Sequence, residues 1–353
     1  MASTATPQAT LPADLLRAKE FAVMQYLVGP NIRPRPARPH SGLFSFAFST
    51  RPQDNVVGIG VGSKLSGGRP SREPAVRFYV ERKVPVEAIP PRCRLPEAID
   101  DIPTDVIETG RFNLQPARAP ITRRRRRPAQ PGGSVGFRFA GADSDLIMAG
   151  TFGAIVEADD LQYILSNNHI LANLNELAPG TPIFQPGLLD SGNPETDQIA
   201  ELGRFIELDF SGPNRVDCAI AKILNTNAVD PTFLPKVGAL KSRTPVKAYE
   251  GMQVHKIART TGYTTGGVVD PSAAVKFDVG TRYLTMEDQV LIDGGRRLFS
   301  ERGDSGAVVV DRDTGRAMAL LVGGVDAVPG KRPLTVASPL AEVLTRLGVR
   351  LVI

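Results

Sequence analysis

The feature that most constrains this fold is a series of short apolar runs separated by turns, which starts at Val135 and continues to residue 338. Short strands at turn-punctuated spacing are typical of β-barrels. The chain also contains 34 glycines and 30 prolines, which suit many turns, and few long helical patterns. We therefore predict a mainly β fold over residues 135–353.

The predicted strands form two groups on either side of a crossover at residues 231–247. The first group would make one barrel and comprises residues 150–156, 162–166, 199–206 and 216–223. The second group would make another barrel and comprises residues 253–257, 267–269, 274–277, 290–293, 307–311, 318–322 and 335–338. A C-terminal helix is expected over residues 339–347, with Ser338 as its N-cap and Pro339 at its first position.

A serine lies between two glycines in Gly303-Asp304-Ser305-Gly306, just before a buried strand of the second group. A serine hydroxyl is a weak nucleophile unless a base takes its proton. The backbone N–H groups of Gly303 and Ser305 can also converge to bind an oxyanion. Taken alone, the motif fits a surface turn equally well, so its interpretation depends on a base and an acid elsewhere.

The candidate base is one of three histidines: His40, His169 and His255. His40 lies in a segment rich in proline and arginine, and His255 lies in an alternating run that reads as a half-exposed strand. His169 comes just past the end of an apolar strand, where functional residues are often found. A hydrogen-bonded structural histidine is the alternative interpretation of His169.

The candidate acid is Asp217, which lies in the mostly apolar run of residues 216–221. A carboxylate in such a run is costly to bury without a partner, although an aspartate facing water at a strand end is the plainer interpretation. Its competitors lie in polar or Gly/Pro-rich surroundings: Asp190, Asp197 and Asp209.

Three segments together resemble the chymotrypsin/trypsin-like serine proteases: Ser166-Asn167-Asn168-His169, the run that starts at Asp217, and Gly303-Asp304-Ser305-Gly306. The chain order His, Asp, Ser is also that of the family. The resemblance covers residues 135–353 and implies two six-stranded β-barrels with a C-terminal helix. It implies that Ser305 is the nucleophile, His169 the base and Asp217 its orienting acid, with an oxyanion hole at Gly303 and Ser305.

The whole chain more weakly resembles bacterial trypsin-like proteins with a small N-terminal domain and plant narrow-leaf-type serine proteases. We expect an N-terminal helix and Pro-rich linker at residues 1–40, with the helix over 11–28, and a small α/β domain at 41–115. Strands of that domain are expected at residues 43–49, 56–63, 75–82 and 105–108. A linker rich in proline and arginine at 116–134 would then lead to the protease domain.

Two positions depart from the trypsin pattern. The resemblance places the base of the specificity pocket six residues before the nucleophile, and Phe299 stands there instead of an acid. Because Gly324 would leave the pocket open, we expect an apolar or aromatic substrate residue. Secreted members of the family pair the aspartate before the nucleophile with a freed N-terminus, so Asp304 needs another partner here. We hypothesise that the N-terminal domain or helix gates the cleft.

Composition limits the partners. The formal net charge of +5 equals the five arginines at 123–127, so the basic character is local. A solvated linker is the simplest interpretation of this run, and the lack of interleaved aromatic residues argues against nucleic acid. No apolar stretch reaches the roughly 18 residues of a membrane span. The two cysteines, Cys93 and Cys218, rule out a disulfide framework and favour a cytoplasmic protein.

No cofactor or metal is expected. Gly58, Gly60 and Gly62 do not match the spacing of a dinucleotide-binding loop, and no clear helix follows them. The sequence therefore predicts a serine endopeptidase acting on protein or peptide substrates, and it leaves the oligomeric state open. Two alternatives remain: an inactive or latent scaffold with a protease fold, and a non-proteolytic acyl hydrolase.

Overall fold

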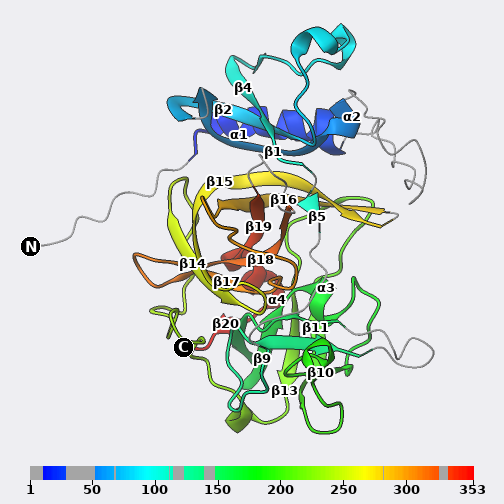
Figure 1. The fold of residues 1–353 in the computed structure, drawn as a ribbon, viewed down its shortest axis with the longest axis vertical. Coiled ribbons are helices and arrows are strands. Elements are labelled where there is room, and N and C mark those ends of the chain that lie inside the picture. Colours follow the sequence, from blue (N-terminus) through cyan, green and yellow to red (C-terminus); the bar gives the residue numbers. More distant parts are fainter. Residues whose placement is uncertain are drawn as a thin grey trace, which may run out of the picture.

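The computed structural model of the chain describes residues 11–28, 52–66, 69–110, 112–113, 123–138, 148–280, 282–325 and 333–353. These residues form three tiers: an N-terminal α/β unit, a closed barrel in the middle and a half-barrel at the other end (Figure 1). The strand expected at 43–49, the Pro-rich linker before it and His40 lie outside the described residues.

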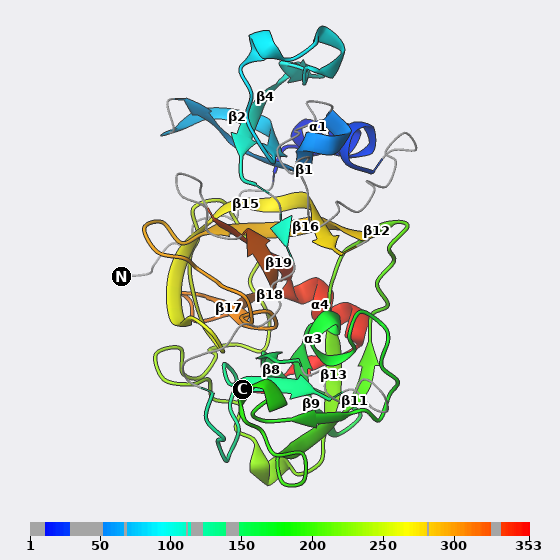
Figure 2. The same ribbon diagram turned by 45° about the vertical axis from the view of Figure 1, so that its right-hand side comes forward.

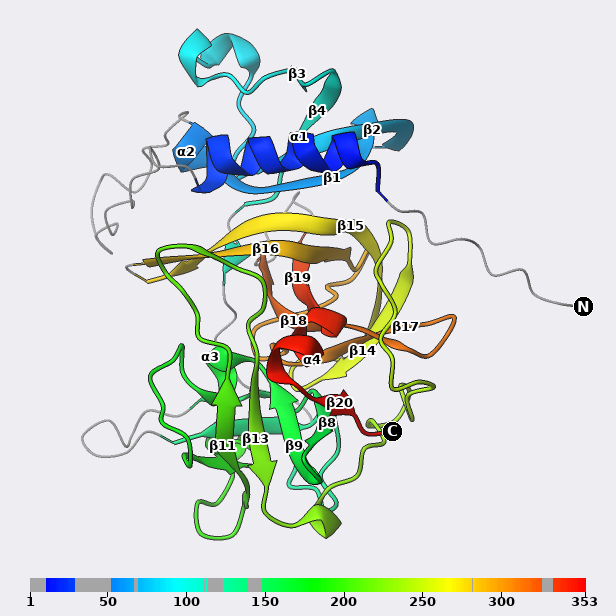
Figure 3. The same cartoon turned by 180° about the vertical axis from the view of Figure 1, so that it is seen from behind.

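The N-terminal unit is a small sheet with one helix packed against it. Its helices are α1 (Ala13–Val23), which continues into the π-helical turn η1 (Met24–Val28), α2 (Pro52–Asn55), and the 3-10 turns η3 (Val86–Ala88) and η4 (Pro91–Cys93). Its strands are β1 (Val56–Ser66), β2 (Arg69–Val80), β3 (Ala98–Ile99) and β4 (Ile102–Glu108). Helix α1 lies along the sheet (Figure 3). Leu15, Ala18 and Ala22 lie on one face of α1 and pack on Ile59 and Phe78 of the sheet.

The middle tier is a ring of six strands in the order β14, β15, β16, β19, β18, β17. Their bounds are β14 (Gln253–Ala258), β15 (Gly262–Val279), β16 (Arg282–Asp293), β17 (Val308–Asp311), β18 (Ala317–Val325) and β19 (Leu334–Pro339). Two short strands join this sheet: β12 (Pro213–Asn214) pairs with β16, and β5 (Phe112–Asn113) pairs with β15 and β18. The nucleophile turn expected at Ser305 precedes β17.

The last tier is a half-barrel that carries the histidine and aspartate segments. Its strands are β6 (Ser134–Phe137), β7 (Gly150–Thr151), β8 (Ala154–Ala158), β9 (Leu161–Ser166), β10 (Pro182–Phe184), β11 (Gln198–Phe205), β13 (Ala219–Ile223) and β20 (Arg350–Leu351). Three single turns connect them: α3 (Asn168–Leu171), η6 (Leu188–Asp190) and η7 (Thr226–Ala228).

The short C-terminal helix α4 (Leu340–Leu347) lies along the seam between the two barrels (Figure 3). One core cluster combines Leu340 and Val343 of α4 with Leu165 of the half-barrel and Val308 of the closed barrel. The helix starts one residue later than expected, because Pro339 occupies the N-cap position. The mainly β, chymotrypsin-like fold is confirmed, with the predicted first barrel present as a half-barrel.

The N-terminal unit shares its sheet with the closed barrel, because β1 pairs with β15 at Gly58–Val275 and Ile59–Ala274 (Figure 2). Polar contacts reinforce this junction. Lys19 Nζ of α1 lies 3.0 Å from Asp288 Oδ1 of β16. The described residues contain no helix whose length and apolar character would allow it to cross a membrane.

The arginine run is packed against the half-barrel. Arg123 Nε lies 2.8 Å from Asp190 Oδ1, and Arg125 Nε lies 2.5 Å from Asp197 Oδ1. Arg127 also contacts Asp197, at 3.6 Å. The two acids are nearly fully buried. Ion pairs therefore anchor a segment whose composition suggests free solvation.

Candidate active site

Strand pairing brings the predicted histidine and aspartate together. β9 ends at Ser166, which is paired with Ala219 at the start of β13. The single helical turn α3 then carries His169, while Asp217 lies two residues before Ala219. Because the two strands are antiparallel neighbours, their adjacent ends place the side chains of His169 and Asp217 in contact.

The Asp217 carboxylate is fully buried and is satisfied by the histidine. The Nδ1 atom of His169 and Oδ2 of Asp217 form a hydrogen bond, and the His169 backbone N–H donates to Oδ1 at 3.2 Å. Asn167 donates from Nδ2 to the Asp217 carbonyl at 2.7 Å, which fixes the loop. A carboxylate on Nδ1 holds the imidazole in the tautomer with a basic Nε2. That Nε2 atom is buried and has no hydrogen-bond partner among the described residues.

The Gly303–Gly306 turn, which is predicted to carry the nucleophile, is shaped by two glycines with positive φ, Gly303 at 95° and Gly306 at 91°. A Cβ on Gly306 would lie 2.1 Å from Ser166 Oγ, so only glycine allows the turn to approach the half-barrel this closely. Thr151 holds the other side: its N–H donates to the Ser305 carbonyl at 2.9 Å, and its hydroxyl donates to the Gly303 carbonyl at 3.1 Å.

The described structure records no acceptor for the backbone N–H groups of Gly303 and Ser305, the two predicted oxyanion donors. Ser305 is buried, and its hydroxyl donates to the carbonyl of Val322 in β18 at 2.9 Å. This carbonyl, rather than His169, is therefore the recorded acceptor of the serine proton. Ser305 Oγ and His169 Nε2 are therefore not hydrogen-bonded to each other in this structure.

Asp304 has a buried lysine as its partner. Lys256 Nζ lies 3.1 Å from Asp304 Oδ2, and both side chains are fully buried. Backbone N–H groups of Thr260 and Thr261 donate to the other oxygen at 2.8 and 3.1 Å. Burial lowers the pKa of Lys256, and the Asp304 carboxylate opposes that shift. This pair supplies the internal cation that the sequence left unidentified.

Lys256 was missed because the run around it reads as half-exposed. The alternation nevertheless carried a signal, since Val254, Lys256 and Ala258 occupy the same face of β14 and all three are buried. The neighbouring His255 points to the other face, where its Nδ1 lies 3.2 Å from the Tyr263 hydroxyl.

The two residues predicted to line a specificity pocket occupy different surroundings. Phe299 is buried in the core of the closed barrel with Val254 and Ile292, and its ring centroid lies 5.5 Å from Lys256 Nζ. Gly324 lies in β18, two residues beyond Val322, and pairs with Thr335 of β19.

Of the competing acids, Asp190 lies in a separate buried cluster, Asp197 is buried against Arg125, and Asp209 is exposed. Asp190 binds the guanidinium of Arg259 in a two-point contact, with Nε at 2.5 Å and Nη2 at 2.8 Å. The Arg259 N–H donates to the Thr151 hydroxyl at 3.1 Å. Because Thr151 donates hydrogen bonds to the Gly303 and Ser305 carbonyls, this cluster helps to hold the turn that carries Ser305. Within the described ranges, no group of three or more His, Cys, Asp or Glu side chains is arranged to hold a metal ion.

Comparison with known proteins gives distant likenesses. No family model matches the chain. It is 23% identical over 331 residues to Protein NARROW LEAF 1 of Oryza sativa subsp. japonica, a match that covers 79% of this chain and 53% of that protein. The chain thus spans about half the length of this curated relative.

Solved structures similar to the chain are chymotrypsin/trypsin-like serine proteases. A glutamic-acid-specific serine protease that uses a histidine triad in substrate binding is 16% identical, with a TM-score of 0.47 over 64% of this chain and 100% of its own. Thermobifida fusca protease A is 18% identical, with a TM-score of 0.45 over 64% and 99%. Cellulomonas bogoriensis chymotrypsin is 16% identical, with a TM-score of 0.43 over the same shares.

Proposed function

We propose that this chain is a serine endopeptidase in which His169, Asp217 and Ser305 carry the chemistry. The observation that supports this most directly is the hydrogen bond between the buried Asp217 carboxylate and His169. The Gly303–Gly306 turn packs on Ser166 and Thr151 of the same half-barrel, which also supports the proposal. A buried carboxylate favours the imidazolium that forms when a histidine takes a proton. We also propose that the chain is a trypsin-like protease of the form that carries an N-terminal extension, and that this extension gates the active-site cleft.

The reaction would proceed in two acyl-transfer steps. Ser305 Oγ bonds to the substrate carbonyl carbon as its proton moves to His169 Nε2, and the carbonyl oxygen becomes an oxyanion. The N–H groups of Gly303 and Ser305 would stabilise that charge, and each such donor typically contributes on the order of 100- to 1000-fold in rate. The C–N bond then breaks as His169 returns the proton to the amine. Water repeats the sequence on the acyl-enzyme.

The substrate is proposed to be an unfolded or exposed segment of a protein, bound with an apolar or aromatic residue in the pocket near Gly324. Phe299 fills the position where an acid would select basic residues, which argues against cleavage after Arg or Lys. A cytoplasmic location is proposed on the two cysteines, which are free and buried in this structure.

The test is labelling of the purified full-length chain with a fluorophosphonate probe, with Ser305→Ala and His169→Ala as controls. We expect labelling of the parent and loss of labelling in both variants. A peptide library with mass-spectrometric readout then separates an endopeptidase from an acyl hydrolase, because only the first cleaves amide bonds within a chain. Equal labelling of the parent and Ser305→Ala would reject Ser305 as the nucleophile.

A latent scaffold is the second candidate, and one observation favours it. The Ser305 hydroxyl is bonded to Val322, and His169 Nε2 has no partner in the described structure. A folded parent chain that shows neither labelling nor peptide cleavage would support this candidate.

A further inference from the structure

The edge of β18 beside Ser305 is the feature that carries a further inference. β19 pairs with β18 along one edge, including Gly323 and Gly324. On the other edge the pairing with β17 starts at Leu320, and the adjacent Leu321 is bonded to the nucleophile turn through Gly306 and Ala307. Past that point, residues 322–325 of β18 present a strand edge directly next to Ser305.

This edge is occupied by the chain itself. The two-residue strand β5 runs antiparallel to β18, with Asn113 opposite Gly324 and Phe112 opposite Val325. Its other side pairs with β15, at Phe277 and Asp278. Because β19 already takes the far edge, β5 must lie on the edge that faces the nucleophile. An extended peptide that adds to an exposed strand edge would use the same backbone groups.

We propose that β5 is an internal competitor for the substrate strand, so that the site opens when β5 leaves β18 and an extended peptide with a large apolar residue takes its place. This inference rests on the proposed function. The length of β5 fits such an exchange, because a two-residue strand offers few backbone hydrogen bonds to break.

The side chain of Phe112 defines what the incoming peptide should carry. Phe112 is fully buried, and its ring makes an edge-to-face contact with Phe277 at a centroid distance of 6.4 Å. The same core cluster contains Val57 and Tyr79 of the N-terminal unit and Val325 of β18. A peptide that replaces β5 in this register fills the vacated space best with an aromatic residue opposite Val325.

The exchange is coupled to the nucleophile through Val322. In an antiparallel strand on this edge, the residue opposite Val322 lies two positions past the residue opposite Gly324. An N–H donated from there to the Val322 carbonyl would compete with the Ser305 hydroxyl, which now uses that acceptor. A bound peptide would thereby favour rotation of Ser305 towards the free Nε2 of His169.

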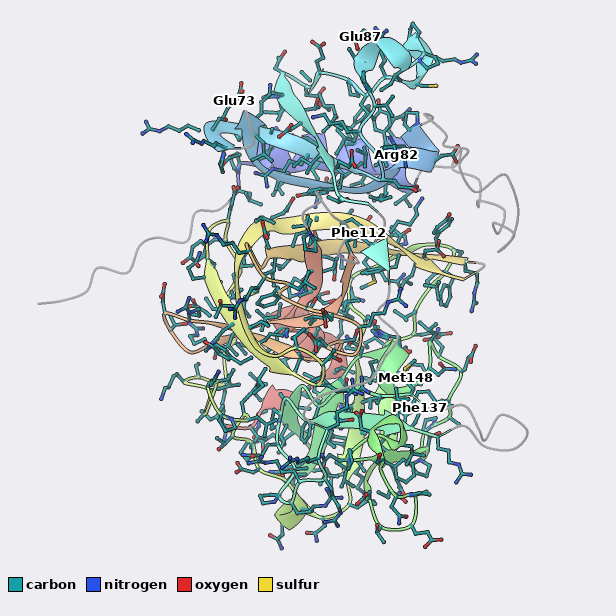
Figure 4. All side chains as sticks on the ribbon, viewed as in Figure 1. Glu73, Arg82, Glu87, Phe112, Phe137 and Met148 are labelled. Atoms are coloured by element: carbon teal, nitrogen blue, oxygen red, sulfur yellow. The ribbon has the colours of Figure 1, made fainter. Side chains whose placement is uncertain are left out.

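The N-terminal unit contacts β5 through Phe112. Figure 4 labels Phe112 on β5, at the end of the closed barrel that lies nearer the N-terminal sheet. A Cβ on Gly58 of β1 would lie 3.2 Å from Phe112 Cε2, so the two strands are in close contact. A shift of β1 relative to β15 would therefore loosen Phe112, and the proposed gating gains a physical route from the N-terminal unit to the edge at Ser305.

A reversible lock tests the proposal. Directly opposed residues of an antiparallel pair lie about 4.5–5.5 Å apart at Cα, within the span of a disulfide. The double variant Asn113→Cys/Gly324→Cys should therefore trap β5 on β18 when oxidised and release it when reduced. Each single variant under the same redox treatment is the control, since the native Cys93 and Cys218 are buried.

Two readouts separate this inference from the proposed function. The first is binding of a fluorescent peptide with the sequence of residues 110–118 to the full chain in a Ser305→Ala background. We expect the oxidised form to bind at least about tenfold more weakly than the reduced form, because occupancy of the edge lowers the competent fraction. The second readout is cleavage of a peptide library by the Asn113→Cys/Gly324→Cys variant that retains Ser305. We expect cleavage to be lost when this variant is oxidised and restored when it is reduced.

Phe112→Ala provides an independent variant, which should bind the peptide about tenfold more tightly than the parent because β5 then competes less well. Equal binding by oxidised and reduced locks, or no gain with Phe112→Ala, would overturn the exchange. Binding that follows the lock without peptide cleavage in any form would support the exchange and reject the endopeptidase. Peptide cleavage that is equal in the oxidised and reduced double variant would support the endopeptidase and reject the exchange.

Discussion

At the scale of single residues, the turn that carries Ser305 depends on a charge pair whose two members lie far apart in the sequence. Asp304 is fixed by Lys256, which comes from β14, 48 positions earlier in the chain. The pair is buried completely, so each charge is compensated only by the other and by nearby hydrogen bonds. The position of the Gly303 and Ser305 N–H groups is therefore set by electrostatics within the closed barrel.

Lys256→Met should destabilise the chain strongly, because it leaves the Asp304 carboxylate buried without its cation. We expect a loss of about 3 kcal/mol in the free energy of unfolding, measured by urea denaturation. The double variant Lys256→Met/Asp304→Asn removes both charges and should recover most of that loss. A single variant as stable as the parent would show that the Thr260 and Thr261 donors suffice for Asp304.

Asp270 gives the junction between the N-terminal unit and the barrel a pH dependence. It accepts a hydrogen bond from the Tyr79 hydroxyl at 2.7 Å, and burial raises its pKa to about 6 although Arg77 and Lys19 oppose the shift. Between its unfolded pKa near 3.8 and about 6, the folded chain holds one more proton than the unfolded chain. Stability therefore falls as pH rises through this window.

Asp270→Asn should remove this contribution. The difference in unfolding free energy between parent and variant is expected to shift by about 2.4 kcal/mol from pH 4 to pH 7, with the parent losing stability as pH rises. Urea denaturation of both chains across that range measures the difference and cancels the titration of other groups. A difference that stays constant with pH would contradict a raised pKa at Asp270.

At the scale of elements, the pairing of β1 with β15 depends on a close approach at Gly60. A Cβ at this position would lie 1.8 Å from Asp270 Oδ2, so Gly60→Ala would displace the carboxylate from Tyr79. We expect a loss of about 2 kcal/mol, as for other overpacked sites. Gly267→Ala in β15 is the matched control, because its Cβ would meet only the end of Gln253 at 3.3 Å. Equal melting temperatures for the two variants would contradict this account.

The strands show which parts of the fold the sequence can predict. Apolar runs bounded by turns located β9, β14 and β17 within one residue at each end, because burial on a barrel leaves a local pattern. The single strand β15 was predicted as two, since register shifts around Asp270 and Ala273 interrupt its alternation.

Other parts of the site depend on distant pairing and carry no such pattern. β5 contains only two residues, and nothing near Phe112 indicates a partner more than 200 positions away in β18. The approach of His169 to Asp217 could be anticipated only from the resemblance in motif order. The orientation of the Ser305 hydroxyl towards Val322 follows from packing, and neither the local sequence pattern nor the resemblance in motif order could predict it.

At the scale of the whole molecule, the sequence suggests a domain boundary at the linker, but the structure joins the N-terminal unit to the closed barrel through one continuous sheet. The Pro/Arg-rich segment suggests a protease that separates cleanly near residue 134. The structure instead runs one sheet from β3 and β4 through β1 into the closed barrel. Ala274 and Val275 of β15 are completely buried, and both face β1 at the junction.

Deletion of residues 1–122 should therefore leave residues 123–353 poorly folded. The truncation leaves the edge of β15 without its partner strand, and an unpaired strand edge favours aggregation. It also removes Tyr79 and Arg77 from the buried Asp270, and a buried carboxylate without hydrogen-bond partners costs free energy. Gel filtration and thermal melting by circular dichroism should show aggregation or a melting temperature at least about 10 °C below the parent. Co-expression of residues 1–122 as a separate chain should restore a soluble complex, because β1 can then pair with β15 again. A monomeric fragment that melts cooperatively at the temperature of the parent would show that the closed barrel is complete by itself, and that the N-terminal unit only sits on it.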